Sequence, residues 1–198
     1  ELESKKIRLD KKNKIDFSDK TKNGTLDISL FNKKTFINYS LDDKSLDFNS
    51  KDKKNFYDGK IDFKPFYLSA NVNYQNLNLK NLLKDDSFLF EIIQSEILNN
   101  KNLNIKVNFL LENIINFHQL KNLNLNVEII EGDINFSDSH VMWKDDFKIS
   151  LKNSLLSYDK NQISLIGKVI INFDNIDDFF SSFQIKKINR KKIDQIEF

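Results

Sequence analysis

The sequence predicts a mainly β protein: a curved antiparallel sheet whose strands meander in chain order, either open like a groove or closed part-way into a half-barrel. Three observations predict this fold class. Hydrophobic and polar side chains alternate with period two along most of the 198 residues, which places the hydrophobic ones on one face of each strand. Turn-forming residues separate these runs at intervals of about 8–12 residues. One segment, residues 78–98, instead spaces its leucines and isoleucines like a helix.

Residues 1–77 contain short alternating runs that predict the N-terminal strands. Asn23-Gly24, Asp42-Asp43 and Asp58-Gly59 have the composition of the turns between them. The hydrophobic positions are Ile7, Leu9, Ile15, Phe17, Leu26, Ile28, Leu30, Ile37, Tyr39, Leu41, Leu46, Phe48, Ile61, Phe63, Leu68, Ala70, Val72 and Tyr74. Because consecutive strands are joined by short turns, we expect neighbours in sequence to pair antiparallel.

The segment 78–98 breaks the alternation. Its apolar residues are Leu79, Leu82, Leu83, Leu89, Ile92, Ile93 and Ile97, at helical spacings of three and four. Asp85–Ser87 interrupts the pattern and is expected to cap a second helical piece that begins near Phe88. The sequence therefore predicts one helical segment packed on the sheet or capping it.

Residues 101–188 predict a C-terminal β meander with longer runs. Asp145-Asp146 and Asp159–Asn161 mark turns within it. The alternating positions are Leu103, Ile105, Val107, Phe109, Leu111, Leu123, Leu125, Val127, Ile129, Ile134, Phe136, Val141, Trp143, Phe147, Ile149, Leu151, Ile163, Leu165, Val169, Ile171 and Phe173. Short C-terminal helices are expected over residues 175–182 and near residues 189–197.

The sequence also shows internal repeats. Lys101–Phe109 resembles Lys121–Ile129, twenty residues further on, and Gly59–Phe63 resembles Gly132–Phe136. Repeated strands that cannot bury their apolar faces alone indicate an extendable sheet. A chain so rich in Lys and Asn can also produce such matches through composition, so both interpretations stay open.

Length and composition fit a single β domain over residues 1–198. Hydrophobic residues make up 39% of the chain and charged residues 30%, with a formal net charge of +2. That charge is too small to predict a nucleic-acid partner. The absence of cysteine excludes disulfides and Cys-ligated zinc. The chain begins with Glu1 rather than Met, so we expect it to be a fragment of a longer chain, and no apolar run approaches the roughly 18 residues of a membrane span.

Enzymatic chemistry finds little support. A nucleophilic triad would need His118 or His140 as its base, but neither lies in a glycine-rich nucleophile turn. Two isolated histidines do not make a zinc site, and Asp174–Asp178 lacks the ligand pattern of a calcium loop. The paired aspartates lie at predicted turns, where carboxylates are solvated. We therefore predict no catalytic residues, no metal site, no cofactor and no enzymatic activity.

The C-terminal part, from Leu120 on, resembles a known family. The stretches that carry the resemblance are Gly132–Trp143, Phe147–Tyr158, Ile163–Gly167, Phe179-Phe180, Phe183–Ile185 and Asn189–Lys192. Their rhythm of glycine, alternating strand, short turn and alternating strand is similar to that of the AsmA-like family of bacterial envelope proteins, which includes TamB-type members. It is a resemblance of pattern and contains no catalytic motif.

The resemblance implies a periplasmic segment of a protein anchored in the inner membrane by a helix outside these residues. It also implies a curved sheet with an apolar groove, phospholipid transport and a part in outer-membrane biogenesis, with lipid acyl chains or envelope proteins as partners. The residues that would line such a lipid groove are Leu123, Leu125, Val127, Ile129, Ile134, Phe136, Val141, Trp143, Phe147, Ile149 and Leu151. Alternatively, the same residues would face a closed core or the 78–98 helical segment. The rival interpretation is a structural or protein-interaction β module of the cell envelope that binds through sheet edges and transfers no lipid.

Overall fold

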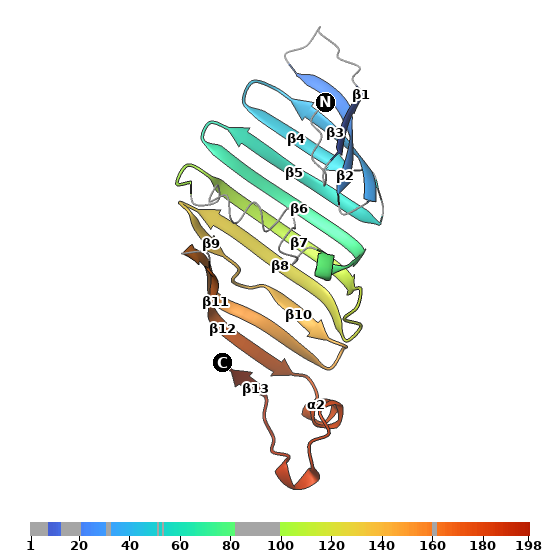
Figure 1. Ribbon diagram of the computed structural model, residues 1–198, viewed down its shortest axis with the longest axis vertical. Helices are drawn as coiled ribbons and strands as arrows, with labels where there is room; N and C mark the ends of the chain where they lie inside the picture. The colour runs from blue at the N-terminus through green and yellow to red at the C-terminus, as the bar shows by residue number, and fades with distance from the viewer. Residues whose placement is uncertain are drawn as a thin grey trace.

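The computed structural model describes residues 8–12, 21–30, 33–50, 52, 54–81, 100–159 and 162–198 (Figure 1). In these residues, thirteen strands form one mixed sheet, so the predicted β class is confirmed. The strands are β1 (Arg8–Lys12), β2 (Lys22–Leu30), β3 (Lys33–Leu41), β4 (Ser45–Ser50), β5 (Asn55–Phe63), β6 (Phe66–Leu77), β7 (Asn104–Ile114), β8 (Leu120–Ile130), β9 (Asp133–Asn135), β10 (His140–Trp143), β11 (Phe147–Asp159), β12 (Gln162–Phe173) and β13 (Gln195–Glu197).

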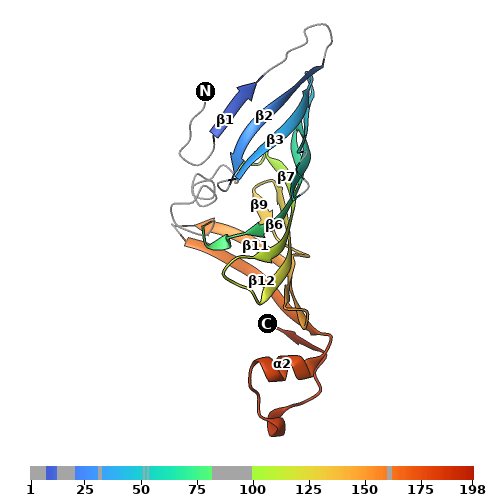
Figure 2. The same cartoon turned by 90° about the vertical axis from the view of Figure 1, so that its right-hand side faces the viewer.

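The strands follow one another across the sheet in chain order, from β1 at one edge to β13 at the other. The short strands β9 and β10 share one place between β8 and β11, because residues 136–139 interrupt the pairing there. Figure 2 shows that the sheet is curved along its length. The predicted meander is thus present, with one break in its alternation of direction.

That break lies between β6 and β7, which pair in parallel, with Ala70 opposite Val107 and Tyr74 opposite Leu111. The sheet is thus mainly antiparallel, as predicted, with one parallel pair at this point. Two parallel neighbours need a connection that returns to the starting end of the sheet, and such a crossover takes a dozen or more residues. Residues 78–103 supply that length, and the chain reverses direction at every other junction of long strands.

Helical structure is a small part of the described residues. The 3₁₀ turn η1 (Leu79–Asn81) opens the crossover, and the rest of the predicted 78–98 helical segment lies almost wholly outside the described residues. The predicted helix at 175–182 is confirmed as α2 (Ile176–Ser182), whose N-cap Asn175 accepts a hydrogen bond from the backbone N–H of Asp177.

The helix predicted near residues 189–197 is wrong. A second 3₁₀ turn, η3 (Lys187–Asn189), is followed by the strand β13, which pairs with β12. Backbone pairing to an open strand edge outweighs the helical spacing of a few apolar residues. Among the described residues, no helix has the length and hydropathy to cross a membrane.

Two of the predicted turns are strand interiors. Gly24 lies within β2 opposite Tyr39, and Gly59 lies within β5 opposite Phe48. In each pair the aromatic ring covers the space above the glycine, since a Cβ built on either glycine would overlap that ring. Such aromatic–glycine pairs stabilise a residue that is otherwise unfavourable in a strand. The turn at Asp42-Asp43 is confirmed: Asp42 accepts the backbone N–H groups of Lys44 and Ser45, and these bonds lower the pKa of its carboxyl group.

The two glycines predict losses of stability of different size on substitution by alanine. At Gly59 a Cβ would also overlap the backbone carbonyl oxygen of Ser69, which cannot move without disturbing β6. We expect Gly59→Ala to lower the free energy of unfolding by about 2 kcal/mol or more. At Gly24 the overlap involves only the end of the Tyr39 side chain, so Gly24→Ala should cost less than about 1 kcal/mol. Urea denaturation of both variants checks this, and equal losses would contradict it.

Candidate functional site: the apolar face of the sheet

The strand register collects the hydrophobic side chains of ten strands, β3 to β12, on one face of the sheet, here called the apolar face. Directly paired residues project to the same side, so each apolar pair extends this face by one strand. Its residues on β6 to β12 are Leu68, Ala70, Val72, Tyr74, Ile105, Val107, Phe109, Leu111, Leu123, Leu125, Val127, Ile129, Ile134, Val141, Trp143, Phe147, Ile149, Leu151, Val169, Ile171 and Phe173. On β3 to β5 the face continues through Ile37, Tyr39, Leu46, Phe48, Tyr57 and Ile61.

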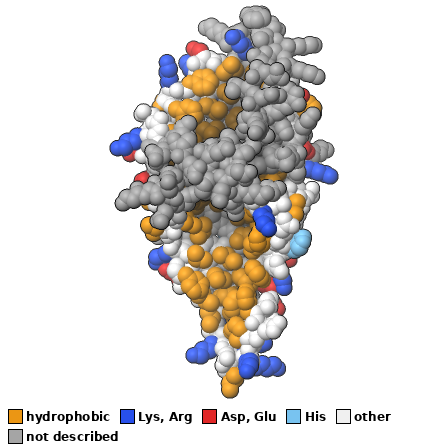
Figure 3. Space-filling view, in the orientation of Figure 1, with side chains coloured by type: hydrophobic (Ala, Val, Ile, Leu, Met, Phe, Trp, Pro, Cys, Tyr) orange, Lys and Arg blue, Asp and Glu red, His pale blue; other side chains and the backbone are white. Residues whose placement is uncertain are grey.

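Ten of the eleven residues predicted to line a groove lie on this face. Ile129, Ile134 and Phe147 are buried, while Leu123, Leu125, Val127, Val141, Trp143, Ile149 and Leu151 are half-buried. Phe136 lies outside the strands: its backbone N–H donates to Ser154 O in the interruption between β9 and β10. The half-buried members keep apolar surface in contact with solvent, as Figure 3 shows for the part of this face below the grey residues.

Sequence reasoning missed the contribution of β6 and β7 to the candidate site. Val107 pairs with Val127, and Phe109 pairs with Leu125, so the face runs without interruption from β8 back into β7. The signal was present, because residues 103–111 have the same alternation as residues 123–129. The parallel pairing of β6 with β7 then carries the face into the N-terminal half.

A tightly packed cluster lies at the centre of the sheet. Tyr57, Tyr74, Leu77, Leu111 and Ile114 are all buried, and half-buried neighbours including Phe109 and Val141 pack against them. The Tyr57 hydroxyl donates a hydrogen bond to the Tyr74 hydroxyl, and the two rings meet edge to face. Burial of the two hydroxyl groups raises the pKa of both tyrosines.

Aromatic side chains close the α2 end of the apolar face. The Trp143 ring stacks on Phe147, with centroids 5.7 Å apart, and Phe179 of α2 meets Phe147 at 5.4 Å and Phe173 at 4.9 Å. Phe183, which follows α2, lies 5.7 Å from Trp143. The helix α2 therefore sits on the same side of the sheet as the apolar face, and Figure 2 shows it displaced to one side of the strands.

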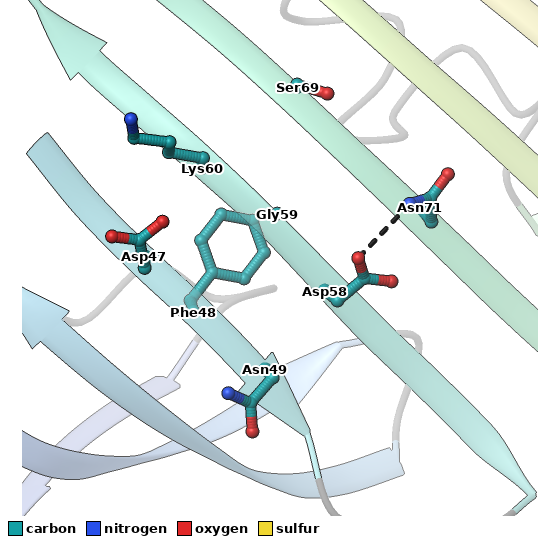
Figure 4. Close-up of a pocket in the computed structure, with 8 residues that line it drawn as sticks. All are labelled: Asp47, Phe48, Asn49, Asp58, Gly59, Lys60, Ser69 and Asn71. Carbon is teal, nitrogen blue, oxygen red and sulfur yellow. Dashed lines mark hydrogen bonds between the residues drawn. The ribbon is translucent and has the colours of Figure 1, made fainter.

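The opposite face, here called the polar face, carries an aligned row of amides and one carboxylate. The row crosses six neighbouring strands through Asn38, Asn49, Asp58, Asn71, Asn108 and Asn126. Asn38 donates to Asn49 at 3.2 Å, and Asn71 donates to Asp58 at 3.1 Å (Figure 4). Part of the asparagine content of the chain thus forms cross-strand hydrogen bonds.

A shallow open recess lies around this row, lined by Asp47, Phe48, Asn49, Asp58, Gly59, Lys60, Ser69 and Asn71 (Figure 4). Its ionisable groups are two carboxylates and one amine, and Lys60 is paired with Asp62 at 3.0 Å. Its lining contains no histidine: His118 lies exposed in the turn after β7, and His140 begins β10. Within the described residues, no group of three His, Cys, Asp or Glu side chains could hold a metal ion.

Comparisons of the chain with protein-family models, with curated proteins and with solved structures find no match.

Proposed function

We propose that the apolar face binds the acyl chains of phospholipids, in a protein of the bacterial cell envelope that handles lipid. The observation that carries this proposal is the unbroken apolar face, most of whose side chains between β7 and β12 are only half-buried. Each methylene that leaves water for such a surface gains about 0.8 kcal/mol, so an acyl chain needs no specific polar contact to bind. The periplasmic location and the inner-membrane anchor belong to the same proposal, and the resemblance of residues 120–198 to AsmA-like proteins supports them.

The contrast between the two faces also favours this function. The polar face carries the cross-strand row of asparagines and exposed lysines beside its exposed hydrophobic side chains, such as Phe36 and Ile166, whereas the apolar face is hydrophobic on one strand after another. Half-buried aliphatic side chains in register over several strands give an extended surface rather than a closed pocket. An extended surface suits a flexible chain, which can bind at many overlapping positions.

Native mass spectrometry of protein purified without detergent tests the proposal. We expect bound phospholipid on the wild-type chain and its loss from Val127→Asp, because a carboxylate at the centre of the apolar face must be desolvated by an acyl chain. Leu110→Asp is the matched control: Leu110 is on the neighbouring strand β7 but projects from the polar face. Circular dichroism shows whether both variants keep the β fold. Equal lipid content in the two folded variants would contradict the proposal.

A second candidate function is protein binding through the edge of β12. Val169 and Phe173 direct their N–H groups outward to the residues that flank β13: the Val169 nitrogen lies 3.1 Å from Phe198 O and the Phe173 nitrogen 3.2 Å from Asp194 O. Because outward and inward groups alternate along a strand, Leu165 and Gly167 also point their backbone groups outward, and no described strand pairs with them.

Such an edge is a template for adding a strand from another protein. This function predicts that Leu165→Pro, which removes one outward N–H, abolishes the partner contact without altering lipid content. Lipid-free wild-type protein that crosslinks to an envelope protein through position 165 would favour this candidate over lipid binding.

A further inference from the structure

The segment that follows α2 forms the far end of the molecule. In Figures 1 and 2 it is the red segment beyond α2, and in Figure 3 a hydrophobic side chain at that end is flanked by Lys and Arg side chains. Residues 179–193 contain five cations and no acidic residue. Four exposed lysines and one isoleucine, here called the basic tip, make up its outer surface: Lys186, Lys187, Ile188, Lys191 and Lys192.

The fold holds the basic tip in a defined shape. Arg190 turns inward: its Nε–H donates to Ile185 O at 3.0 Å, and its guanidinium group lies 5.7 Å from the centroid of the buried Phe180 ring. The Ile185 N–H donates to Phe180 O at 2.8 Å, and Asn189 N–H donates to Lys186 O at 2.9 Å. The one arginine is therefore used to anchor the segment to α2, while the four lysines project into solvent.

The charge of the basic tip is not balanced by ion pairs within the described part of the chain. None of the ion pairs found there involves its lysines. Ile188 is 89% exposed, the highest value among the large hydrophobic side chains described. An exposed aliphatic side chain surrounded by lysines is suited to a lipid interface, because the aliphatic side chain can insert among the lipids while the lysines bind their phosphate groups.

We propose that the basic tip docks on the surface of an anionic phospholipid bilayer, with Ile188 inserted among the lipids. A nucleic acid fits less well, because residues 184–193 contain no aromatic ring on which a base could stack. The nearest exposed ring, Phe183, contacts Phe179 at 4.7 Å and Trp143. The site is separate from the acyl-chain surface proposed above, and it does not require that surface to bind lipid.

Vesicle sedimentation tests the docking. The purified chain is mixed with vesicles of phosphatidylcholine alone or with added phosphatidylglycerol. We expect binding only to the anionic vesicles, with at least about tenfold weaker affinity for Lys186→Glu/Lys187→Glu. Lys54→Glu/Lys101→Glu makes the same change of charge at two exposed lysines outside the tip and should alter the affinity less than about twofold. Equal weakening by both double variants, or equal binding to both vesicles, would overturn the proposal.

A second measurement tests insertion without relying on the charge variants. The chain has no cysteine, so Ile188→Cys and Lys54→Cys each accept one environment-sensitive fluorophore. Anionic vesicles should increase the emission of the probe at position 188 and leave that at position 54 unchanged. Inorganic phosphate at matched ionic strength should not displace the vesicles. No increase at position 188, displacement by phosphate, or tip-dependent binding to single-stranded DNA in preference to vesicles would refute docking on a bilayer.

Discussion

Leu111→Ala is expected to lower the free energy of unfolding by about 3 kcal/mol, within the range of about 2–5 kcal/mol for removing a buried leucine. Leu111 is 1% exposed and pairs with Tyr74 on β6 and Leu123 on β8, so it joins the two halves of the sheet at the parallel junction. The cavity would open between strands whose backbone pairing fixes their separation, which limits collapse. A loss of this size is a large fraction of the stability of an ordinary domain.

The neighbouring residue provides the control for this prediction. Leu110 lies on the same strand with the same side chain, but it is 36% exposed on the polar face. Leu110→Ala should therefore cost less than about 1 kcal/mol. Urea denaturation followed by circular dichroism measures both values. If the two variants lost equal stability, the assignment of the apolar face at β7 would be wrong.

Alkaline pH is expected to destabilise the protein through Tyr57 and Tyr74. The pKa of each is raised in the folded state above the value of about 10 that a tyrosine has in an unfolded chain. The unfolded state therefore loses its protons first as the pH rises. The contribution of the two tyrosines to the free energy of unfolding is complete below about pH 10. Above that pH it decreases by up to about 1.4 kcal/mol per pH unit for each tyrosine.

The double variant Tyr57→Phe/Tyr74→Phe isolates this effect. Other groups also titrate above pH 10, but only this pair is absent from the variant, so the difference between the two pH profiles belongs to the tyrosines. Urea unfolding at pH 8, 10 and 11 should give a steeper fall for the wild type than for the variant. Parallel profiles would mean that the two hydroxyls are hydrated in the folded state.

The period-two pattern predicted the β class, and ten of the eleven residues proposed for a groove lie on the apolar face, because alternation fixes the face of each side chain within a strand. It could not predict how strands would be placed beside one another. The parallel step between β6 and β7 depends on the length and path of residues 78–103, and this step aligns Phe109 with Val72. The alternation also could not show that Phe136 falls in an interruption of pairing.

Turn-forming residue types correctly predicted the turn at Asp42-Asp43 but wrongly predicted turns at Gly24 and Gly59. The difference has one physical reason. The Asp42 carboxylate accepts backbone donors within its own turn, which is a local interaction readable from sequence. Gly24 and Gly59 lie within strands, where the rings of Tyr39 and Phe48 on neighbouring strands cover them. These contacts are tertiary and cannot be inferred from the residues adjacent in sequence. The row of asparagines on the polar face is likewise a result of register, which local composition does not contain.

Fluorescence of Trp143 tests most directly whether the apolar face binds acyl chains. Trp143 is the one tryptophan of the chain, and it lies half-buried on this face, stacked on Phe147. A short-chain phosphatidylglycerol brominated on its acyl chains, kept below its micelle concentration, offers single lipids and no bilayer on which the basic tip could dock. Acyl-chain binding predicts saturable quenching of Trp143 that Val127→Asp weakens and Leu110→Asp leaves intact. Unquenched emission from folded protein would contradict lipid binding and leave the open edge of β12 as the functional surface.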